Sequence, residues 1–459
     1  MRWRIGVRMA AARRALYAAA DAIFPIAFGI LLPLIAAAGV YRLWLRGRPA
    51  SLWGTTPILT LPLLARADRM LGFTSQSVVH TTYHITNQFD LVLAGCADRL
   101  SRSAPHLLPT FYRIVFLWAL LRFDVFHFFY DRGLLERPSR MGISRDELAL
   151  LKRAGKRVYL YAYGADVRTQ AETRALGTYN CCMHCDGVGS NCICDSEEAA
   201  RNQAYYRKYT TALVATGDMM MYVPGALNLW YWPVDTGRVS YSGVAWDGRG
   251  PLRIFHAPNH PWAKGSQYLI STVERLRGEG LPIELTTVTK VSNLQLMKIM
   301  AEADVLVDQL LIGWHGYTAL EGLAQGKVVV CFIRDRAMLL EPAECPIISA
   351  SPDTIEDVFR GLLERSPQEL ARLGRLGRGY VEKHFSIAAV AGRLCRLYLS
   401  TARLPTVSER RLVDAMTVID LTPSASLDVE GEQLPPAHGD LEPQHEFGHE
   451  RDLRMGYRC

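Results

Sequence analysis

The sequence of 459 residues predicts an α/β fold with two Rossmann-like, doubly wound domains and an N-terminal apolar membrane-associated segment. Short apolar or β-branched runs alternate with helical segments, first from Pro57 onward and again from Leu252. Alternating strands and helices are typical of parallel sheets with right-handed crossovers, and two such series indicate two domains. The third observation is an uncharged run of twenty residues, Ala22 to Tyr41, near the start of the chain.

These patterns divide the chain into four predicted regions. Residues 1–50 form the basic and apolar membrane-associated segment, 51–235 the first domain, 236–400 the second domain and 401–459 a disordered tail. The join between the domains is expected near 232–250. The tail has five prolines and no sustained periodicity, which is typical of disorder.

The uncharged run of the first region spans about 30 Å as a helix, enough to cross a bilayer. Arginines lie on both sides of it, which favours an in-plane or re-entrant helix with both ends on the cytoplasmic face. A buried core helix and a signal peptide cleaved at 36–38 are the alternatives. The net charge is +7, and the eight arginines and one acid of residues 1–50 account for all of it. The remaining chain is neutral, which argues against nucleic acid as a partner.

In the first domain, strands are expected at four β-branched or aromatic runs, 77–82, 125–130, 158–163 and 213–215. Helices are expected between them, such as 107–121 and 145–154. The segment Tyr163 to Arg168, with the sequence YGADVR, follows the third of these strands. Because ligands of open α/β sheets bind beyond the carboxyl ends of strands, this segment is a candidate site. A structural ion pair or a cap is the alternative for Asp166 and Arg168.

In the second domain, strands and helices alternate from Leu252. The expected strands are 252–256, 283–288, 305–308 and 328–332, and the expected helices are 267–278, 292–303, 317–325 and 367–400. The loop after the first strand ends in Lys264 and Gly265. Lys264 can meet a phosphate as a point charge, and Gly265 allows close approach of the backbone. A solvated loop lysine is the alternative.

The loop after the third strand of this domain leads into a helix and reads GWHGYTALE from 313 to 321. Three backbone amides at the helix start are expected to face an anion, those of Gly316, Tyr317 and Thr318. Glu321 lies one turn further, where its carboxylate can accept bonds from two vicinal hydroxyls. Alternatively, Glu321 only complements the dipole of its helix. The alternative for His315 is a turn or core histidine without contact to a ligand.

Three stretches resemble a known family: HAPNHPWAKG at 256–265, EADVLVDQLLIGWHGYTALEGLAQGKVVVCFI at 302–333 and RGYVEKHFS at 378–386. They resemble the donor-binding half of retaining GT-B glycosyltransferases of the glycosyltransferase family 4 (group 1) type. The resemblance covers roughly residues 55–400. It implies a nucleotide sugar held between two Rossmann-like domains, without a catalytic divalent metal.

The resemblance also implies roles for individual residues. Lys264 binds the diphosphate, Glu321 binds the ribose, and Asp166 orients the sugar or the acceptor; these three form the predicted catalytic set. The predicted donor-binding residues are Gly164, Arg168, Gly265, His315, Gly316, Tyr317 and Thr318.

Two positions depart from the pattern of that family. The family carries two glutamates eight positions apart, and eight before Glu321 stands Gly313, so the carboxylate that contacts the donor sugar is missing. His315 and Asp308 are candidates to compensate. Tyr163 stands where a histidine is common.

The expected function is transfer of a sugar from a nucleotide-sugar donor, with retention, to an unidentified acceptor at the cytoplasmic face of the membrane. The N-terminal segment suggests a lipid-linked or envelope glycan as acceptor. The alternative is a catalytically silent GT-B scaffold or a redox- or metal-sensing binding protein, which the missing first glutamate favours.

Half of the ten cysteines lie in one stretch, NCCMHCDGVGSNCICD from 180 to 195, within the first domain. Cys182, Cys185, Cys192 and Cys194 form two closely spaced pairs, which is typical of a tetrahedral thiolate site. Because a cytosolic enzyme keeps its thiols reduced, a structural zinc ion is expected there, with Cys181 left over. An iron–sulfur cluster or redox switch, disulfides and unligated thiols are the alternatives. Acidic residues flanking the cluster argue against a nucleic-acid-binding zinc module.

Overall fold

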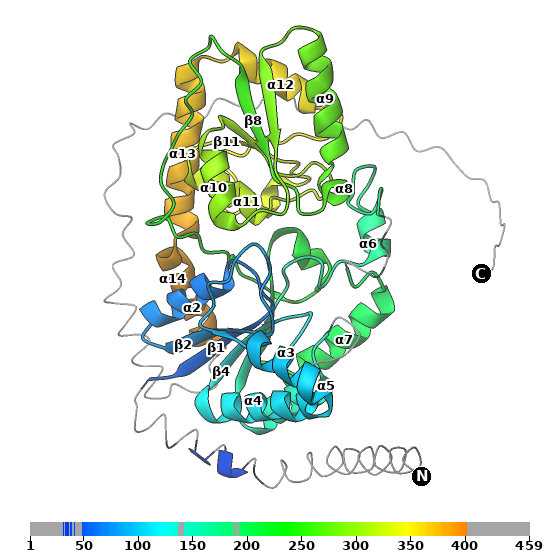
Figure 1. Cartoon of the computed structure of the whole chain (residues 1–459), viewed down its shortest axis with the longest axis vertical. Coiled ribbons are helices and arrows are strands. Elements are labelled where there is room, and N and C mark those ends of the chain that lie inside the picture. Colours follow the sequence, from blue (N-terminus) through cyan, green and yellow to red (C-terminus); the bar gives the residue numbers. More distant parts are fainter. Residues whose placement is uncertain are drawn as a thin grey trace, which may run out of the picture. The chain divides into compact units, whose positions relative to one another are not determined.

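The computed structural model describes residues 48–135, 142–185, 187, 189 and 192–401, together with 31, 33–35, 37–38 and 41 (Figure 1). Most of the uncharged N-terminal run, and the tail from 402 onward, lie outside the described residues. No helix within these described ranges is long and apolar enough to cross a bilayer. The membrane-associated segment and the disordered tail therefore stay predictions.

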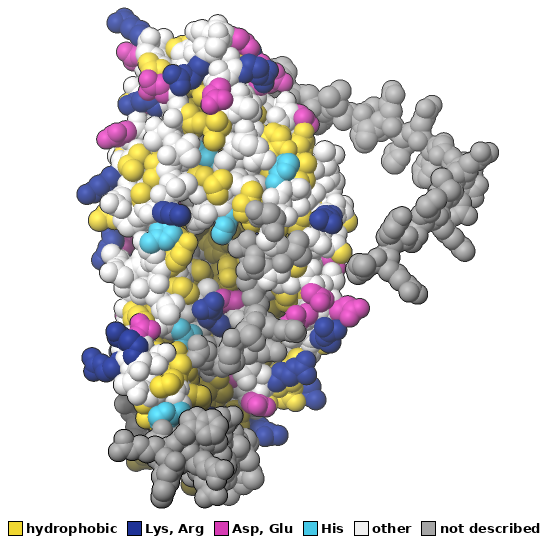
Figure 2. Space-filling view, turned by 45° about the vertical axis from the view of Figure 1, so that its right-hand side comes forward, with side chains coloured by type: hydrophobic (Ala, Val, Ile, Leu, Met, Phe, Trp, Pro, Cys, Tyr) yellow, Lys and Arg dark blue, Asp and Glu magenta, His cyan; other side chains and the backbone are white. Residues whose placement is uncertain are grey.

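The charged side chains are mixed in sign on the face drawn in Figure 2. Lys and Arg (dark blue) are interspersed there with Asp and Glu (magenta). This distribution agrees with the neutral charge of residues 51–459.

The first sheet has seven parallel strands in the order β3-β2-β1-β4-β5-β6-β7. Its strands are β1 (Ala50–Thr55), β2 (Thr74–Val79), β3 (Leu91–Val92), β4 (Val125–Phe129), β5 (Arg157–Tyr161), β6 (Ala212–Ala215) and β7 (Leu227–Asn228). The first six follow the order of a doubly wound Rossmann sheet, which confirms the expected fold class of this half. The sequence analysis missed β1, because Ser51 and Gly54 weaken the β-strand pattern of its six residues.

Helices cover both faces of this sheet, which parallel strands require. The helices of this half are α2 (Leu61–Met70), α3 (Ala94–Ser103), α4 (Leu108–Arg122), α5 (Arg145–Arg153), α6 (Gln170–Arg174) and α7 (Ser196–Tyr209). On β4, Phe126 and Phe128 belong to the core under α4, α5 and α7, whereas Val125 and Phe129 belong to the core under α2. The strands are therefore apolar on both faces.

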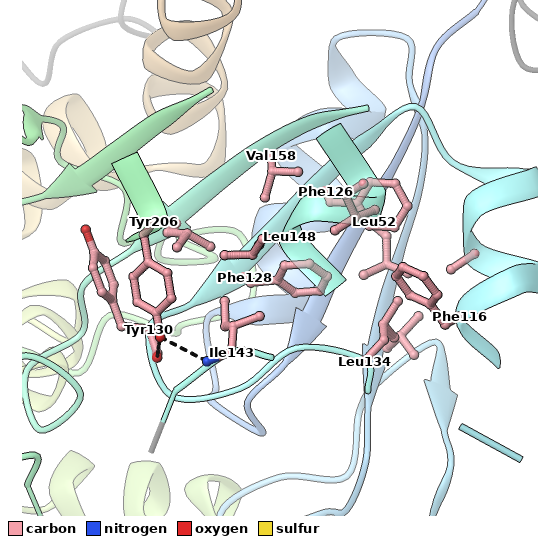
Figure 3. Close-up of a cluster of buried hydrophobic side chains, with 14 of the residues drawn as sticks. Leu52, Phe116, Phe126, Phe128, Tyr130, Leu134, Ile143, Leu148, Val158 and Tyr206 are labelled. Carbon is pink, nitrogen blue, oxygen red and sulfur yellow. Dashed lines mark hydrogen bonds between the residues drawn. The ribbon is translucent and has the colours of Figure 1, made fainter. Parts of the chain in front are cut away.

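The first of these two cores is drawn in Figure 3. Aromatic and aliphatic side chains of β4 and β5 pack there against Phe116 of α4 and Leu148 of α5. Tyr206 of α7 is one of several tyrosines in this core, and its hydroxyl accepts a hydrogen bond from the amide of Ile143 at 3.0 Å. This bond ties the loop after β4 to α7.

The second sheet has four parallel strands in the order β11-β10-β8-β9. Its strands are β8 (Leu252–His256), β9 (Ile283–Thr287), β10 (Val305–Val307) and β11 (Val328–Val330). Its helices are α8 (Pro261–Lys264), α9 (Ser266–Gly278), α10 (Asn293–Ala301), α11 (Tyr317–Ala324), α12 (Ile355–Glu364) and α13 (Pro367–Phe385). The expected strands and helices 252–332 are confirmed, with bounds that differ by two residues at most. Two parallel α/β sheets are thus present, as predicted.

The helix expected over 367–400 is two helices. Ser366 caps α13 with a capping box, and Ser386 separates α13 from α14 (Ile387–Ser400). α14 falls in the range predicted for the second domain, yet it packs against α2 on the first sheet (Figure 1). Beside this junction, the amide of Val234 donates to the carbonyl of Phe385 at 2.7 Å, so the two connections between the halves run side by side.

Candidate functional site

The two predicted loops of the second half follow neighbouring strands, β8 and β10. The next strand in sequence after β8 is β9, which lies on the opposite side of β8, so the strand order reverses between β8 and β10. Ligands of open α/β sheets bind at such switch points. Lys264 ends α8 after β8, and Gly316 is the N-cap of α11 after β10. The fold therefore brings these two residues, 52 positions apart in sequence, to one place.

Asp308, directly after β10, accepts hydrogen bonds from both Lys264 and Gly316. Its Oδ1 accepts a hydrogen bond from Nζ of Lys264 at 2.7 Å, and its Oδ2 accepts one from the amide of Gly316. A Cβ at position 316 would lie 2.9 Å from Oδ2 of Asp308, so only glycine allows this approach. The sequence analysis expected the Gly316 amide to face a ligand, whereas the structure gives it to the Asp308 carboxylate. The site thus contains an internal anion.

Other donors for an anion remain at the same place. An ammonium group has three N–H groups, and Asp308 takes one from Lys264. The first amides of a helix have no partner within the helix, and Tyr317 and Thr318 are the first residues of α11. Gly265 is the N-cap of α9, with its backbone in the left-handed region at φ 74°. These groups can bind an anion together.

Glu321 lies one turn into α11 and is buried, with 5% of its surface exposed. Its Oε1 accepts a hydrogen bond from Nδ2 of Asn293 at 2.6 Å, and burial raises the pKa of its carboxyl to about 7. Asn293 also contacts the first half, because its amide donates to the carbonyl of Ile85 at 2.9 Å. The second oxygen of Glu321 has no hydrogen-bond partner among the described residues, so it can accept a bond from a ligand.

His315, predicted to bind the donor, has a packing role in this structure. Its ring is 1% exposed and stacks on Trp314 with ring centroids 4.7 Å apart. Burial lowers its pKa, so the ring is neutral at pH 7. The contact with Trp314 fixes the turn that leads into α11.

In the first half, Asp166 is bonded to the backbone. Its carboxylate accepts from the amides of Tyr163, Gly164 and Tyr130 at 3.0, 2.8 and 3.2 Å, and the residue is 2% exposed. Burial, with the charge of Asp131 next, raises its pKa to about 8. Asp166 therefore shapes the loop after β5, and its predicted direct contact with a sugar stays a prediction.

Arg168, predicted to bind the donor, is paired within the protein. Its Nη2 lies 2.7 Å from Oδ2 of Asp218, which lies three residues after the end of β6 in a short 3-10 helix, Gly217–Met221. A Cβ at Gly164 would lie 2.6 Å from Nη1 of Arg168, so the guanidinium covers this glycine. Arg168 is thus in an ion pair, with Asp218 and not Asp166 as its partner, and its predicted contact with the donor stays a prediction.

A cluster of polar side chains at the switch point of the first sheet, between β1 and β4, was not predicted from the sequence. Asp131 after β4 accepts from the hydroxyl of Thr56 at 2.5 Å, and burial raises its pKa. His80, after β2, has Nε2 2.8 Å from the carbonyl of Gly133. The signal available was a polar residue one or two positions after the ends of β1, β2 and β4, and it was hidden because β1 was not predicted.

The five clustered cysteines lie around one hollow. Cys181, Cys182, Cys185, Cys192 and Cys194 line it, together with Arg168, Thr169, Gln170 and Trp262. No disulfide joins any of the nine cysteines that the structure describes, and the sulfur of Cys194 accepts a bond from the amide of Gly189 at 3.2 Å. The loop also contacts the second half, since His184 lies 2.8 Å from the hydroxyl of Tyr268.

Within the described part of the chain, no three His, Cys, Asp or Glu side chains are placed to hold a metal ion. A tetrahedral zinc site needs four sulfurs about 2.3 Å from the metal, so the cysteines would have to come closer together to hold zinc. Convergence of the thiols on one hollow supports the donor set that the sequence predicts. The zinc site itself stays a prediction.

We expect one zinc ion per chain in protein purified under reducing conditions. Because four thiolates close the coordination sphere, Cys182→Ser and Cys192→Ser should each lose most of the metal. Elemental analysis by mass spectrometry measures this, with Cys96→Ser, an exposed cysteine outside the hollow, as the control. Metal-free protein with ten titratable thiols contradicts the zinc site, and iron in place of zinc favours the cluster alternative.

No protein-family model and no curated protein matches this sequence. Solved structures with similarity include the Anabaena protein HepE in complex with UDP and glucose, at 9% identity and TM-score 0.48, covering 77% of this chain and 100% of that chain. Sucrose-phosphate synthase from Thermosynechococcus elongatus has 13% identity and TM-score 0.49, covering 77% and 98%. A glycosyltransferase from Rickettsia africae has 12% identity and TM-score 0.47, covering 78% and 99%. Likenesses this distant do not assign an activity to this chain.

Proposed function

We propose that this chain is a glycosyltransferase that takes a sugar from a nucleotide-sugar donor. One observation carries the proposal: Lys264, the first amides of α11 and Glu321 lie together at the switch point of the second sheet. A cation beside free helix amides suits a diphosphate. A buried carboxylate one helical turn away suits the two vicinal hydroxyls of a ribose.

The proposed mechanism is electrostatic. The diphosphate leaving group gathers negative charge as its bond to the sugar breaks. Lys264 and the amides of Tyr317 and Thr318 stabilise that charge, and they act strongly because the site is partly withdrawn from water. Asp308 orients Lys264 through one hydrogen bond and leaves its other donors for the phosphates.

The finer points of the proposal rest on the family resemblance and on the N-terminal sequence. Transfer with retention follows from the resemblance to family 4 enzymes. A lipid-linked or envelope glycan as acceptor, and a location at the cytoplasmic face of a membrane, follow from the uncharged run at 22–41. The donor site can work without any of these three features.

A second candidate function is a silent scaffold that binds a partner without catalysis. Asp308 favours it, because a carboxylate already satisfies Lys264 and the Gly316 amide where a diphosphate is expected. A scaffold predicts no binding of nucleotide sugars.

A screen of nucleotide sugars separates the two candidates. Thermal stabilisation of the purified chain by one nucleotide sugar, confirmed by calorimetry, is the result expected of the transferase. Release of nucleoside diphosphate with that donor then tests catalysis. If neither nucleotide sugars nor free nucleoside diphosphates bind, the transferase proposal is wrong.

Donor affinity should rise as pH passes through about 7. Burial raises the pKa of Glu321 to about 7, so at pH 6 its carboxyl is mostly protonated, and at pH 8 it is ionised and accepts hydroxyl bonds through the oxygen that Asn293 does not occupy. Calorimetry with a nucleotide sugar at pH 6, 7 and 8 measures this, because its diphosphate diester keeps the same charge throughout. Glu321→Gln should remove most of this rise, and an equally steep rise in the variant contradicts the assignment.

A further inference from the structure

Arg334 fills the space that a side chain at position 313 would occupy. Gly313 has φ 85°, and a Cβ there would lie 2.1 Å from Nη1 of Arg334. The guanidinium is held in place, because Nη1 donates to the carbonyl of Ile312 at 3.1 Å and Nη2 to that of Tyr179 at 2.6 Å. The guanidinium of Arg334 therefore occupies the space beside the turn before α11, where Gly313 has no side chain.

This charge has no carboxylate partner among the described residues. The nearby Arg168 is paired with Asp218, and the charges of both act on Arg334. A guanidinium has five N–H groups, and the two bonds to carbonyls use two of them.

Three buried polar atoms around the contact of Gly217 with Trp314 have no hydrogen-bond partner among the described residues. They are Oγ1 of Thr216, Oδ1 of Asp218 and Nε1 of Trp314, in residues that are 1%, 4% and 2% exposed. Thr216 and Asp218 flank Gly217, which touches the ring of Trp314. Unpaired buried polar atoms cost free energy, so they mark a place where a polar ligand completes the bonding. Sugar hydroxyls both donate and accept hydrogen bonds.

The turn from 313 to 316 joins the two places. At its end, Gly316 donates to Asp308, which also holds Lys264, whereas at its start Gly313 lies against Arg334 and Trp314 lies against Gly217, the neighbour of Asp218. A nucleotide sugar is linear, with ribose, diphosphate and sugar in that order. With ribose at Glu321 and diphosphate at Lys264, the sugar extends toward Asp218 and Arg334.

We propose that the transferred sugar is acidic and that Arg334 binds its carboxylate. The proposal rests on the proposed function, whose donor site it extends. A planar guanidinium matches the two oxygens of a carboxylate, which makes the contact specific for a uronic acid over its neutral parent sugar. Asp218 and Trp314 then bond the hydroxyls of the same sugar ring.

The test compares neutral and acidic donors of the same nucleotide on the full chain. Affinities are measured by calorimetry for UDP-glucose against UDP-glucuronate and for GDP-mannose against GDP-mannuronate, with UDP and GDP alone as references. We expect the acidic member of one pair to bind about 10-fold or more tightly than the neutral member. In Arg334→Gln this preference should disappear while affinity for the bare diphosphate changes less than about 3-fold.

Two further variants complete the test. Arg334→Lys keeps the charge without the planar fork and should retain only part of the preference. Arg201→Gln, on an exposed helix face, should leave it unchanged. Equal binding of neutral and acidic donors, or a preference that survives in Arg334→Gln, overturns the acidic-sugar proposal and leaves the transferase proposal standing. Absence of binding by any nucleotide overturns both.

Discussion

Lys264→Ala should weaken binding of the nucleotide donor by about 100-fold or more. The variant removes the cation that meets the phosphates, and it also leaves the Asp308 carboxylate, which is fully buried, facing them without a counter-charge. Loss of one partner of a buried pair costs about 3–5 kcal/mol of stability, so the variant should also unfold at lower urea concentration. Calorimetry and urea unfolding measure the two effects separately.

The double variant Lys264→Ala/Asp308→Asn separates binding from folding. Removing the second charge should restore most of the stability, because no unpaired buried charge remains. Donor affinity should stay low, because the cation is still missing. Lys298→Ala, an exposed lysine on α10, is the matched control and should change neither property. Donor affinity within about 3-fold of the parent in Lys264→Ala would contradict the assignment of Lys264 to the diphosphate.

The second sheet could be predicted nearly to the residue, because its signals are local. β10 and β11 are short apolar runs, β8 and β9 mix apolar with polar residues, and each following loop holds a polar or glycine-bearing segment before a helix. The rule that ligands bind beyond strand ends then places Lys264 and Gly316 in the site without knowledge of the contacts. Local pattern and general topology were sufficient there.

Contacts between distant residues could not be predicted in this way. Asp308 pairs with Lys264 across 44 positions, and Arg334 fills the space of Gly313 across 21. Nothing in the spacing of either residue indicates its partner, because both pairs arise from the packing of loops after different strands. The same holds for α14. Its sequence shows an apolar face but not which sheet that face covers, and in the structure it packs on the first sheet.

The position of α14 depends on a cluster of buried, hydrogen-bonded side chains around Asp68 of α2. Its carboxylate accepts hydrogen bonds from Ser51 at 2.6 Å, from Nε1 of Trp53 at 2.8 Å and from the hydroxyl of Tyr398 on α14 at 2.6 Å. Tyr398 also lies 3.1 Å from Nε2 of His127. Burial raises the pKa of Asp68 to about 6 and lowers that of His127. At pH 7 an ionised carboxylate therefore holds three donors inside the protein.

Asp68→Ala should lower the free energy of unfolding by about 3–5 kcal/mol at pH 7. Three buried donors lose their acceptor, which outweighs the relief of removing a buried charge. Tyr398→Phe removes one of the three bonds and should cost about 1–3 kcal/mol. Urea unfolding measures both, with Asp98→Ala, an exposed acid on α3, expected within about 0.5 kcal/mol of the parent.

The pH dependence of stability gives an independent check on the same residue. Because the pKa of Asp68 is higher in the folded state, ionising it costs more there than in the unfolded chain. The contribution of this group is therefore most favourable below pH 3.8, declines as pH rises to about 6 and is constant above. Asp68→Ala should lack this decline, so the loss relative to the parent should be larger at pH 4 than at pH 7. A loss that is the same at both pH values would show that the pKa of Asp68 is not raised in the folded state, which contradicts the assignment of its carboxylate to a fully desolvated position.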